Sequence, residues 1–267
     1  MKLKDWLKEN TSVFNKRDLA YLLKIVINKD YRLIENYPLS LRKRKYLNNL
    51  RDAYRRGWPL AYLVKREDFF GLGFLIRKGV FIPRPETEII VEKSLEIIHC
   101  KRIRMVLDLC CGTSCIAVAL KKNTEENIIV YASDVSSSAI SVSIENIKLH
   151  KTKVNLIMSD LFSAFKKNSF DLIVSNPPYV ESDCIKGGLC FEPRISLDGG
   201  KDGLFFVYKI LKMAPSYLRD GGYLILEIGY NQKDRVNKRI EHSGKFTVVE
   251  WIKDYAGLDR GVVLRKK

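Results

Sequence analysis

Beyond Pro83, short apolar runs alternate with helical patterns to the end of the chain, and this alternation limits the possible folds. Strands that alternate with helices form a parallel sheet, with the helices packed on its faces. Four of the apolar runs end in a polar side chain or a turn of small residues: 105–109, 128–134, 154–160 and 170–175. Because open α/β sheets bind ligands at the carboxyl ends of their strands, we expect a binding site at that edge.

The fourth run is followed directly by Asn176, Pro177, Pro178 and Tyr179, read as NPPY. An amide or aromatic amino nitrogen attacks a methyl donor only when acceptors hold its N–H bonds and aim its lone pair. The Asn176 side-chain oxygen and the Pro177 carbonyl are candidate acceptors. Pro178 keeps the turn rigid, and Tyr179 offers a flat face for a planar group. The alternative is an ordinary strand-ending turn, since Asn-Pro pairs are frequent in turns.

The first apolar run leads into a turn of small residues before a helical pattern begins. Small residues let the backbone approach a ligand closely, and a helix start supplies free N–H groups, which is typical of a nucleotide-type site. The turn is not a phosphate-binding loop, because no Lys-Ser or Lys-Thr follows it, and it lacks G-x-G-x-x-G. The candidate residues are Asp108, Cys110, Cys111, Gly112, Thr113 and Ser114.

Acidic residues end the second and third runs. Asp134 is placed to accept both hydroxyls of a ribose, and the alternative is a helix cap in front of the helical pattern at 136–150. Asp160, next to Leu161, is placed to accept from the amino group of an adenine. A small loop, two acids and NPPY on four strand ends form a combination much less frequent by chance than any one of them.

These segments resemble the S-adenosylmethionine-dependent glutamine methyltransferases of peptide chain release factors, the HemK type. NPPY is shared with adenine amino-group methyltransferases, so it identifies a chemistry. The more specific segments are IPRPETE at 82–88 and FEPR at 191–194 with LDGGKDGL at 197–204. They resemble the release-factor branch more than the ribosomal-protein glutamine methyltransferases. The resemblance covers most of the chain and also includes 108–117, Asp134, 160–162, 175–180 and 221–227.

The resemblance implies a Rossmann-like class I methyltransferase with a seven-stranded sheet and an N-terminal helical domain. It implies S-adenosyl-L-methionine as the cofactor and the Gln of the Gly-Gly-Gln motif of release factors as the methylated residue. The cofactor is expected over the Cys110 to Ser114 loop and beside Asn176, with its ribose on Asp134 and its adenine between Asp160 and Leu161. Transfer is expected to be a direct in-line displacement.

Three positions depart from the family pattern. The cofactor loop of the family usually has three glycines, whereas Cys110 and Ser114 stand at two of these places. A serine at position 114 requires that the backbone avoid positive φ, so we expect a weakened affinity for the cofactor. Lys65 stands where the family tends to have Gly, which we expect to matter little for chemistry.

The chain divides into three parts by pattern: a helical domain at 1–60, a β-hairpin linker at 61–84 and the methyltransferase domain at 85–267. Helical patterns cover 2–10, 16–27 and 39–56, and Gly57-Trp-Pro59 is a stop signal. Pro85 is expected to open the next helix, with Glu86 and Glu88 in its first turn. The last strands, near 245–251 and 260–265, are expected to form a closing hairpin by family analogy.

Positive charge is concentrated in the N-terminal part. Residues 1–82 contain 19 Lys or Arg against 8 Asp or Glu, a net +11 of the total +16. Such a surface steers encounter with an acidic protein face or nucleic acid, and the alternative is an ordinary solvated surface. The basic run at 42–45 is not interleaved with aromatics as a base-stacking platform is, so we favour protein docking and expect no stable nucleic-acid complex.

The chain lacks an apolar run of eighteen residues and the apolar core of a signal peptide, so we expect a cytoplasmic protein without a membrane partner. We also expect a monomer. Its six cysteines form no CxxC pair, and we expect no metal site. Three other readings stay open. One is an adenine amino-group methyltransferase acting on DNA or RNA, the second is a ribosomal-protein glutamine methyltransferase, and the third is a cofactor-binding scaffold without transferase activity. The roles of Glu192 and Glu227 are not assigned by the sequence.

Overall fold

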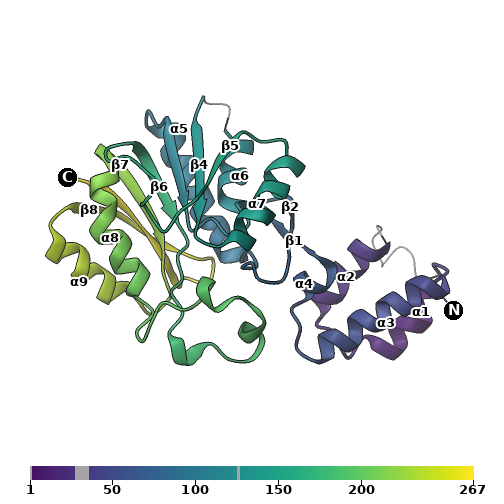
Figure 1. Ribbon diagram of the computed structural model, residues 1–267. Coiled ribbons are helices and arrows are strands. Elements are labelled where there is room, and N and C mark those ends of the chain that lie inside the picture. The colour runs from purple at the N-terminus through teal and green to yellow at the C-terminus, as the bar shows by residue number, and fades with distance from the viewer. Residues whose placement is uncertain (1, 28–35, 125–126) are drawn as a thin grey trace. The chain divides into compact units, whose positions relative to one another are not determined.

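The computed structural model describes residues 2–27, 36–124 and 127–267, which group into two compact units. One unit comprises Met1–Arg66 with Gly187–Phe191, and the other comprises Glu67–Lys186 with Glu192–Lys267. Figure 1 labels the elements of both. The expected division into 1–60, 61–84 and 85–267 stays a prediction.

The first unit consists of helices around a small apolar core. Trp6, Leu22 and Leu47 are fully buried in it. Phe191, at the end of the short 3-10 helix η4, also belongs to this unit, and its ring lies 4.8 Å from that of Trp58. The helices are α1 (Leu3–Asn10), α2 (Lys16–Ile27), α3 (Leu41–Arg55) and α4 (Leu60–Val64). The helical patterns read from the sequence are therefore present, with ends that differ by at most two residues.

The predicted β-hairpin is shorter than expected. Its strands are β1 (Arg66–Phe69) and β2 (Leu72–Leu75), whereas residues 61–64, expected to begin the first strand, belong to the helix α4. The run LAYLV is buried in either conformation, and the preceding proline favours a helix start. Lys65 ends this helix with φ of +57°, a backbone conformation that glycine adopts more freely. This explains the family preference for glycine at that position.

The second unit is built on a seven-stranded sheet in the order β5-β4-β3-β6-β7-β9-β8. The first five strands of this order are parallel, and β9 is antiparallel to both β7 and β8. The expected closing hairpin is thus confirmed. The strands are β3 (Met105–Leu109), β4 (Ile129–Asp134), β5 (Val154–Met158), β6 (Phe170–Ser175), β7 (Leu218–Glu227), β8 (Phe246–Lys253) and β9 (Asp259–Lys266).

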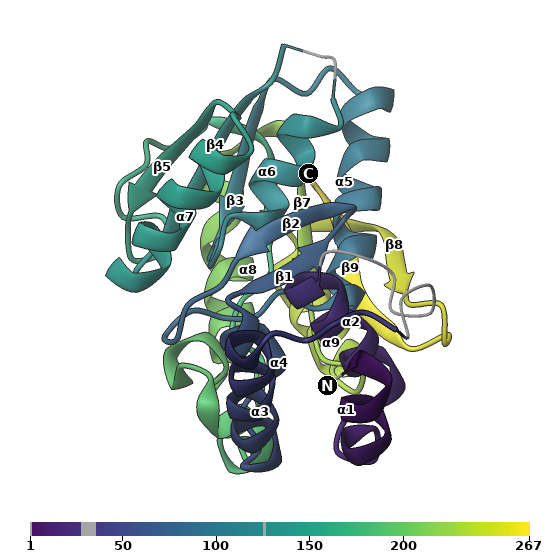
Figure 2. The ribbon, with the colours of Figure 1, turned by 90° about the vertical axis from the view of Figure 1, so that its right-hand side faces the viewer.

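Helices cover both faces of this sheet. In Figure 1, α6 and α7 lie on one side and α8 and α9 on the other, and Figure 2 views the sheet from the side of α6 and α7. Neighbouring strand residues point to opposite faces: Val106 packs with α5 and α6, whereas Leu107 packs with α8 and α9. The helices are α5 (Glu88–Cys100), α6 (Cys115–Lys122), α7 (Ser137–Leu149), α8 (Phe205–Tyr217) and α9 (Lys233–Ser243).

The strand order reverses between β3 and β6, which are neighbours in the sheet. In an open α/β sheet, ligands bind in the crevice at the carboxyl ends of the strands beside such a switch point. Leu109 and Ser175, the last residues of β3 and β6, are paired, so the two following loops start at the same level. The small-residue loop and NPPY therefore leave the sheet side by side.

Candidate active site

NPPY begins at the end of a firmly held central strand. The Ser175 hydroxyl donates to the Leu109 carbonyl at 2.7 Å, which ties the end of β6 to the end of β3. Pro177 and Pro178 are buried, whereas Asn176 and Tyr179 keep partly exposed side chains. The turn predicted from the sequence therefore presents two polar side chains at the carboxyl edge of the sheet.

The Asn176 side chain has a defined orientation. Its amide nitrogen Nδ2 donates to the Thr87 hydroxyl at 3.0 Å. Thr87 is only 2% exposed and ends the 3-10 helix η2 (Pro85–Thr87), which Pro85 opens as expected, directly before α5. Because the N–H side of the amide faces Thr87, the oxygen Oδ1 faces away from it and is presented as an acceptor.

Tyr179 is held at both its ring and its backbone. Its hydroxyl donates to Glu227 Oε1 at 2.9 Å, and its carbonyl accepts from Gln232 Nε2 at 3.0 Å. Burial raises the pKa of Tyr179 well above its ordinary value, and the neighbouring Glu227 raises it further. The phenol is therefore a neutral hydrogen-bond donor at physiological pH.

Glu227 ends β7 and is 1% exposed. Burial raises its pKa to about 7, although hydrogen bonding by Thr87 and Tyr179 and the charge of Arg260 oppose the shift. Its second oxygen, Oε2, is buried with no partner at hydrogen-bonding geometry among the described residues. A carboxyl of this kind titrates near neutrality next to the NPPY residues.

Glu192 of the FEPR segment fixes the approach to η2. Its Oε2 accepts from the Ile82 backbone N–H at 3.1 Å, and its Oε1 forms an ion pair with Arg84. The Glu192 side chain is 3% exposed, so its carboxylate is shielded from water, whereas the Arg84 side chain is 29% exposed. The FEPR and IPRPETE segments, far apart in the sequence, are thus joined, and the joint places Thr87 beside Asn176.

The LDGGKDGL segment supports NPPY through close backbone packing. A Cβ at Gly203 would lie 2.4 Å from the Tyr179 carbonyl oxygen, and a Cβ at Gly199 would lie 2.6 Å from the Gly203 oxygen. Both distances are shorter than side chains tolerate, so only glycine permits this arrangement. Asp198 completes the turn by accepting from the Ser182 hydroxyl at 2.6 Å and the Gly200 N–H at 2.9 Å.

The expectation for the loop after β3 is wrong in one respect. Ser114 adopts φ of +59° and Cys110 adopts φ of +63°, so both take the left-handed conformation that the family glycines favour. Ser114 is completely buried, and its hydroxyl donates to Ser143 Oγ at 2.8 Å, which in turn donates to the Gly112 carbonyl at 2.9 Å. These hydrogen bonds offset the local strain, which costs about 1–2 kcal/mol for a residue with a Cβ.

The acids at the strand ends differ in exposure. Asp108 is fully buried, and its Oδ2 accepts from the Ala117 N–H at 3.0 Å, so it braces the loop against α6. Asp134 Oδ2 accepts from the Gly112 N–H and Oδ1 from the Ser136 N–H, both at 2.9 Å. Ser136 is the cap of α7, so Asp134 is not a helix cap. Its carboxylate instead faces the small-residue loop.

The third strand end completes this edge. The Ser159 N–H donates to the Asp134 carbonyl at 2.9 Å, which joins the ends of β5 and β4. Asp160 is exposed, with Lys209 Nζ 3.9 Å from its Oδ1, whereas Leu161 is buried with φ of +48°. Val135, which the sequence reading missed, leaves 51% of its apolar side chain exposed next to Asp134. The available signal in the sequence was a lone apolar residue between Asp134 and the serines at 136–138.

These residues fit an adenosyl cofactor in their chemistry. Two buried oxygens of the loop, Asp108 Oδ1 and Thr113 Oγ1, have no hydrogen-bond partner among residues 2–27, 36–124 and 127–267. Asp134 uses one lone pair of each oxygen on the backbone, so further donors such as ribose hydroxyls find acceptors there. Cys111 and Thr113 are themselves buried, which leaves Cys110 and Gly112 as the partly exposed part of the loop.

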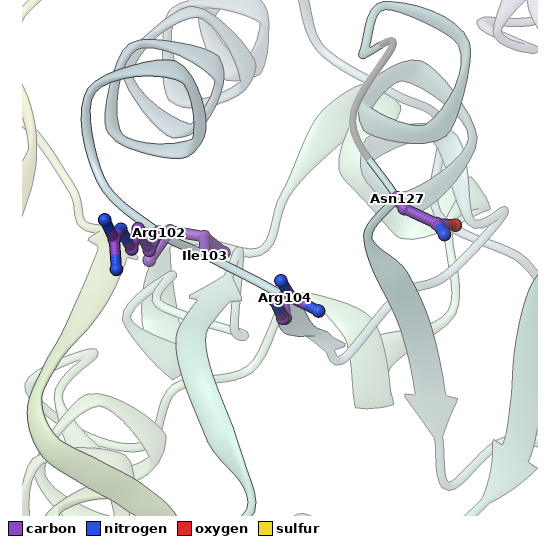
Figure 3. A pocket seen from close by; sticks show the side chains of 4 residues that line it. All are labelled: Arg102, Ile103, Arg104 and Asn127. Atoms are coloured by element: carbon purple, nitrogen blue, oxygen red, sulfur yellow. The ribbon is translucent and has the colours of Figure 1, made fainter.

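A cavity of about 460 Å³ lies elsewhere and does not serve this site. It is lined by Arg102, Ile103, Arg104 and Asn127, shown in Figure 3. These residues precede β3 and β4, so they lie at the amino ends of the strands, opposite the NPPY edge. Over the described ranges, we find no helix with both the length and the apolar character to cross a membrane and no cluster of acidic, His and Cys side chains suited to a metal ion.

Ser114→Gly tests the corrected view of the loop. Because Ser114 is buried beneath the loop, we expect affinity for S-adenosylhomocysteine to stay within about threefold, since the relief of strain offsets the lost hydrogen bond to Ser143. Isothermal titration calorimetry measures this affinity. Ser114→Ala is the matched control, because it keeps the strain and removes only the hydroxyl. A weakening of about tenfold or more in both variants would show that the serine hydroxyl contributes directly to binding.

Comparison with known proteins agrees with this geometry. Residues 85–189 match the model of the methyltransferase small domain. The release factor glutamine methyltransferase of Clostridium botulinum is 39% identical over 287 aligned positions, which cover 100% of both chains. That of Thermodesulfovibrio yellowstonii is 36% identical, over 100% of this chain and 99% of the relative.

Solved structures show the same fold. A methyltransferase from Pyrococcus furiosus superimposes with a TM-score of 0.55 at 20% identity, over 85% of this chain and 98% of that chain. The expected class I sheet is therefore confirmed. By its sequence similarity over the full length, the chain belongs to the family of release factor glutamine methyltransferases, enzymes that use S-adenosyl-L-methionine as the methyl donor.

Proposed function

We propose that this protein methylates the side-chain amide nitrogen of the glutamine in the Gly-Gly-Gln motif of peptide chain release factors. The observation that supports this proposal is the orientation of the Asn176 amide, whose nitrogen Nδ2 donates to the Thr87 hydroxyl oxygen at 3.0 Å. Its oxygen is thereby kept as an acceptor for one N–H of a planar amide. The Pro177 carbonyl is the proposed acceptor for the second N–H.

The site works mainly by positioning. The bound cofactor supplies an electrophilic methyl group on a sulfonium centre. With both N–H bonds of the substrate held, its nitrogen lone pair points out of the amide plane toward that carbon. Asn176 and Pro177 would hold the substrate nitrogen during methyl transfer, with the thioether form of the cofactor as the leaving group and water as the acceptor of the proton that the methylated nitrogen loses. Such positioning contributes on the order of 7–11 kcal/mol to a reaction between two bound groups.

The cofactor-binding residues follow from the strand ends. We propose that the ribose hydroxyls bind Asp134, that the adenine lies at Asp160 and Leu161 with Val135 against its face, and that the methionine part lies over Cys110 to Ser114. The supporting observation is the Gly112–Asp134 hydrogen bond, which joins the first and the third of these places. Tyr179 is proposed to flank the substrate amide. Since translation termination takes place in the cytosol, we propose that the protein acts there, as a monomer.

Labelled S-adenosylmethionine tests the substrate directly. Purified protein is incubated with intact release factor, with the same factor carrying Ala in place of the motif glutamine, and with DNA or RNA. We expect label only in the unmodified factor. Label in nucleic acid and none in the factor would favour the adenine methyltransferase reading. Absence of transfer to every substrate, with cofactor still bound, would favour the scaffold reading.

The basic run on α3 is proposed to capture the substrate. Arg42, Arg44 and Lys45 are exposed, whereas Lys43 donates to the Tyr37 hydroxyl at 2.8 Å and is partly buried. Replacing the three exposed residues by Glu is expected to raise KM for intact release factor on the order of tenfold at low salt and to leave kcat nearly unchanged, because exposed charges act mainly on association.

A matched control separates local docking from net charge. Lys151, Lys166 and Lys167 are exposed in the second unit, and their replacement by Glu changes the net charge by the same amount. A short peptide with the Gly-Gly-Gln motif should respond to neither triple variant. An equal rise in KM for both triple variants, or no rise for the α3 variant at low salt, would contradict the docking role.

A further inference from the structure

The two prolines of NPPY have no backbone N–H, so the hydrogen bonds that fix this turn must reach its carbonyls or the residues around it. Before the prolines, the Ser175 hydroxyl ties the end of β6 to the end of β3 at 2.7 Å. Directly after them, the Tyr179 carbonyl accepts from the side-chain nitrogen Nε2 of Gln232 at 3.0 Å. Because a proline ring locks φ, the direction of the Pro177 carbonyl depends on how these two ends are held.

Gln232 is a buried amide whose hydrogen-bonding groups are all engaged. It is 2% exposed and stands directly before α9. Its Nε2 donates to the Tyr179 carbonyl and, at 3.2 Å, to the Gly203 carbonyl. Its Oε1 accepts from the Gly229 backbone N–H at 2.9 Å. A primary amide has two N–H donors, and both are used here. One side chain therefore joins NPPY, the LDGGKDGL segment and the turn after β7.

Close packing keeps this amide in one orientation. A Cβ at Gly203 would lie 2.6 Å from Gln232 Nε2, and a Cβ at Gly229 would lie 3.2 Å from Gln232 Cδ. The backbone of Gln232 is fixed as well, since its N–H donates to the Gly229 carbonyl and its carbonyl accepts from the Val236 N–H, both at 3.0 Å. The Tyr179 carbonyl is thus held by a rigid group.

We propose that Gln232 is a positioning residue for methyl transfer: by holding the Tyr179 carbonyl, it keeps the NPPY turn in the shape that aims the Pro177 carbonyl at the substrate nitrogen. The inference rests on the proposed function, because that acceptor is needed only by a substrate with a planar NH2 group. Gln232 is buried and spends both donors on protein carbonyls, so it acts through Tyr179 and not by touching the substrate.

Two substitutions separate the donor side of this amide from its acceptor side. Gln232→Met keeps the length of the side chain and removes both sides, whereas Gln232→Glu keeps the acceptor for the Gly229 N–H and loses the NH2 group. We expect both variants to lower the single-turnover rate of release factor methylation about tenfold, because a small displacement near the reacting atoms is costly. KM for S-adenosylmethionine should change less than about threefold, since the proposed cofactor residues follow β3, β4 and β5.

Ile98→Ala is the control for lost stability. Ile98 is fully buried near the end of α5 that is remote from Thr87, and its truncation leaves a cavity in the core. We expect a lower melting temperature and an unchanged methylation rate per folded molecule. Melting temperatures and the stoichiometry of S-adenosylhomocysteine binding, measured by calorimetry, give the folded fraction of every variant.

The outcomes separate this inference from the proposed function. The parent enzyme alone decides whether release factor is the substrate, and the variants are compared with the parent on whichever planar NH2 substrate it methylates. The positioning role is refuted if both folded variants keep the methylation rate within about threefold, with only their melting temperatures lowered. It is also refuted if the loss lies mainly in KM for S-adenosylmethionine, or if Gln232→Glu is fully active, since the donors to Tyr179 and Gly203 would then be irrelevant.

Gln232→Asn decides the question if neither of these variants folds. It retains the amide on a stem one methylene shorter, which does not reach both carbonyls from the same backbone position. We expect the methylation rate to fall at least about threefold while the cofactor still binds. An unchanged rate in folded Gln232→Asn would overturn the positioning role.

Discussion

Asn176→Ala is expected to lower single-turnover methylation on the order of 100- to 1,000-fold while cofactor binding stays largely intact. The residue supplies one of two acceptors for the substrate NH2 group, and one lost hydrogen bond of this kind in an active site costs about 2.7–4 kcal/mol. The measurement combines rapid-quench methylation of release factor with calorimetric titration of S-adenosylhomocysteine. The loss should appear in the chemical step.

Asn237→Ala is the control for this variant. Asn237 lies on the exposed face of α9, where its side-chain nitrogen donates to Glu241 at 2.9 Å, so its loss should not alter methylation. Turnover of Asn176→Ala within about threefold of the parent would rule out the acceptor role. A large loss of cofactor affinity would instead indicate that Asn176 contacts the cofactor.

Gly203→Ala is expected to damage both stability and activity. Gly203 has φ of +71°, and an added Cβ would lie 2.4 Å from the Tyr179 carbonyl oxygen and 2.6 Å from Gln232 Nε2. Backbone strain and overpacking together should cost about 3 kcal/mol or more. The displaced Tyr179 should lower kcat by at least about tenfold, because small misplacements near a reacting group are costly.

Gly71 gives a matched position for comparison. It also has φ of +71°, but a Cβ there would meet nothing within 4 Å, so Gly71→Ala carries the strain without the collision. We expect it to cost about 1 kcal/mol and to leave kcat unchanged. Chemical denaturation and steady-state kinetics of both variants provide the test. Equal destabilisation of the two would show that the contact with Tyr179 is not tightly packed.

The site residues that directly follow or end an apolar run could be predicted from the sequence. NPPY follows a run of six residues that are apolar enough to be a buried strand, and the acids at 134 and 160 end two further runs. Because all these runs are parallel strands, their ends had to meet at one edge of the sheet. The strand prediction for residues 61–64 failed, since so short an apolar run satisfies a buried strand and a buried helix equally well.

The partners of these residues were not predictable from the sequence. Thr87 and Asn176 are 89 positions apart, and Glu192 and Ile82 are 110 apart, so no local pattern reports their hydrogen bonds. The prediction that the backbone at Ser114 avoids positive φ failed for a different reason. Its left-handed conformation is disfavoured locally and persists because Ser143, 29 positions away, satisfies its hydroxyl.

The position of Phe191 bears on the order in which the chain folds during synthesis. The first 66 residues leave the ribosome long before Phe191 is made, yet Phe191 belongs to their compact unit and lies against Trp58. The helical unit therefore emerges incomplete and receives its last aromatic contact only after NPPY has been translated. The helical unit can therefore complete its packing only after Phe191, the first residue of the FEPR motif, has been synthesised.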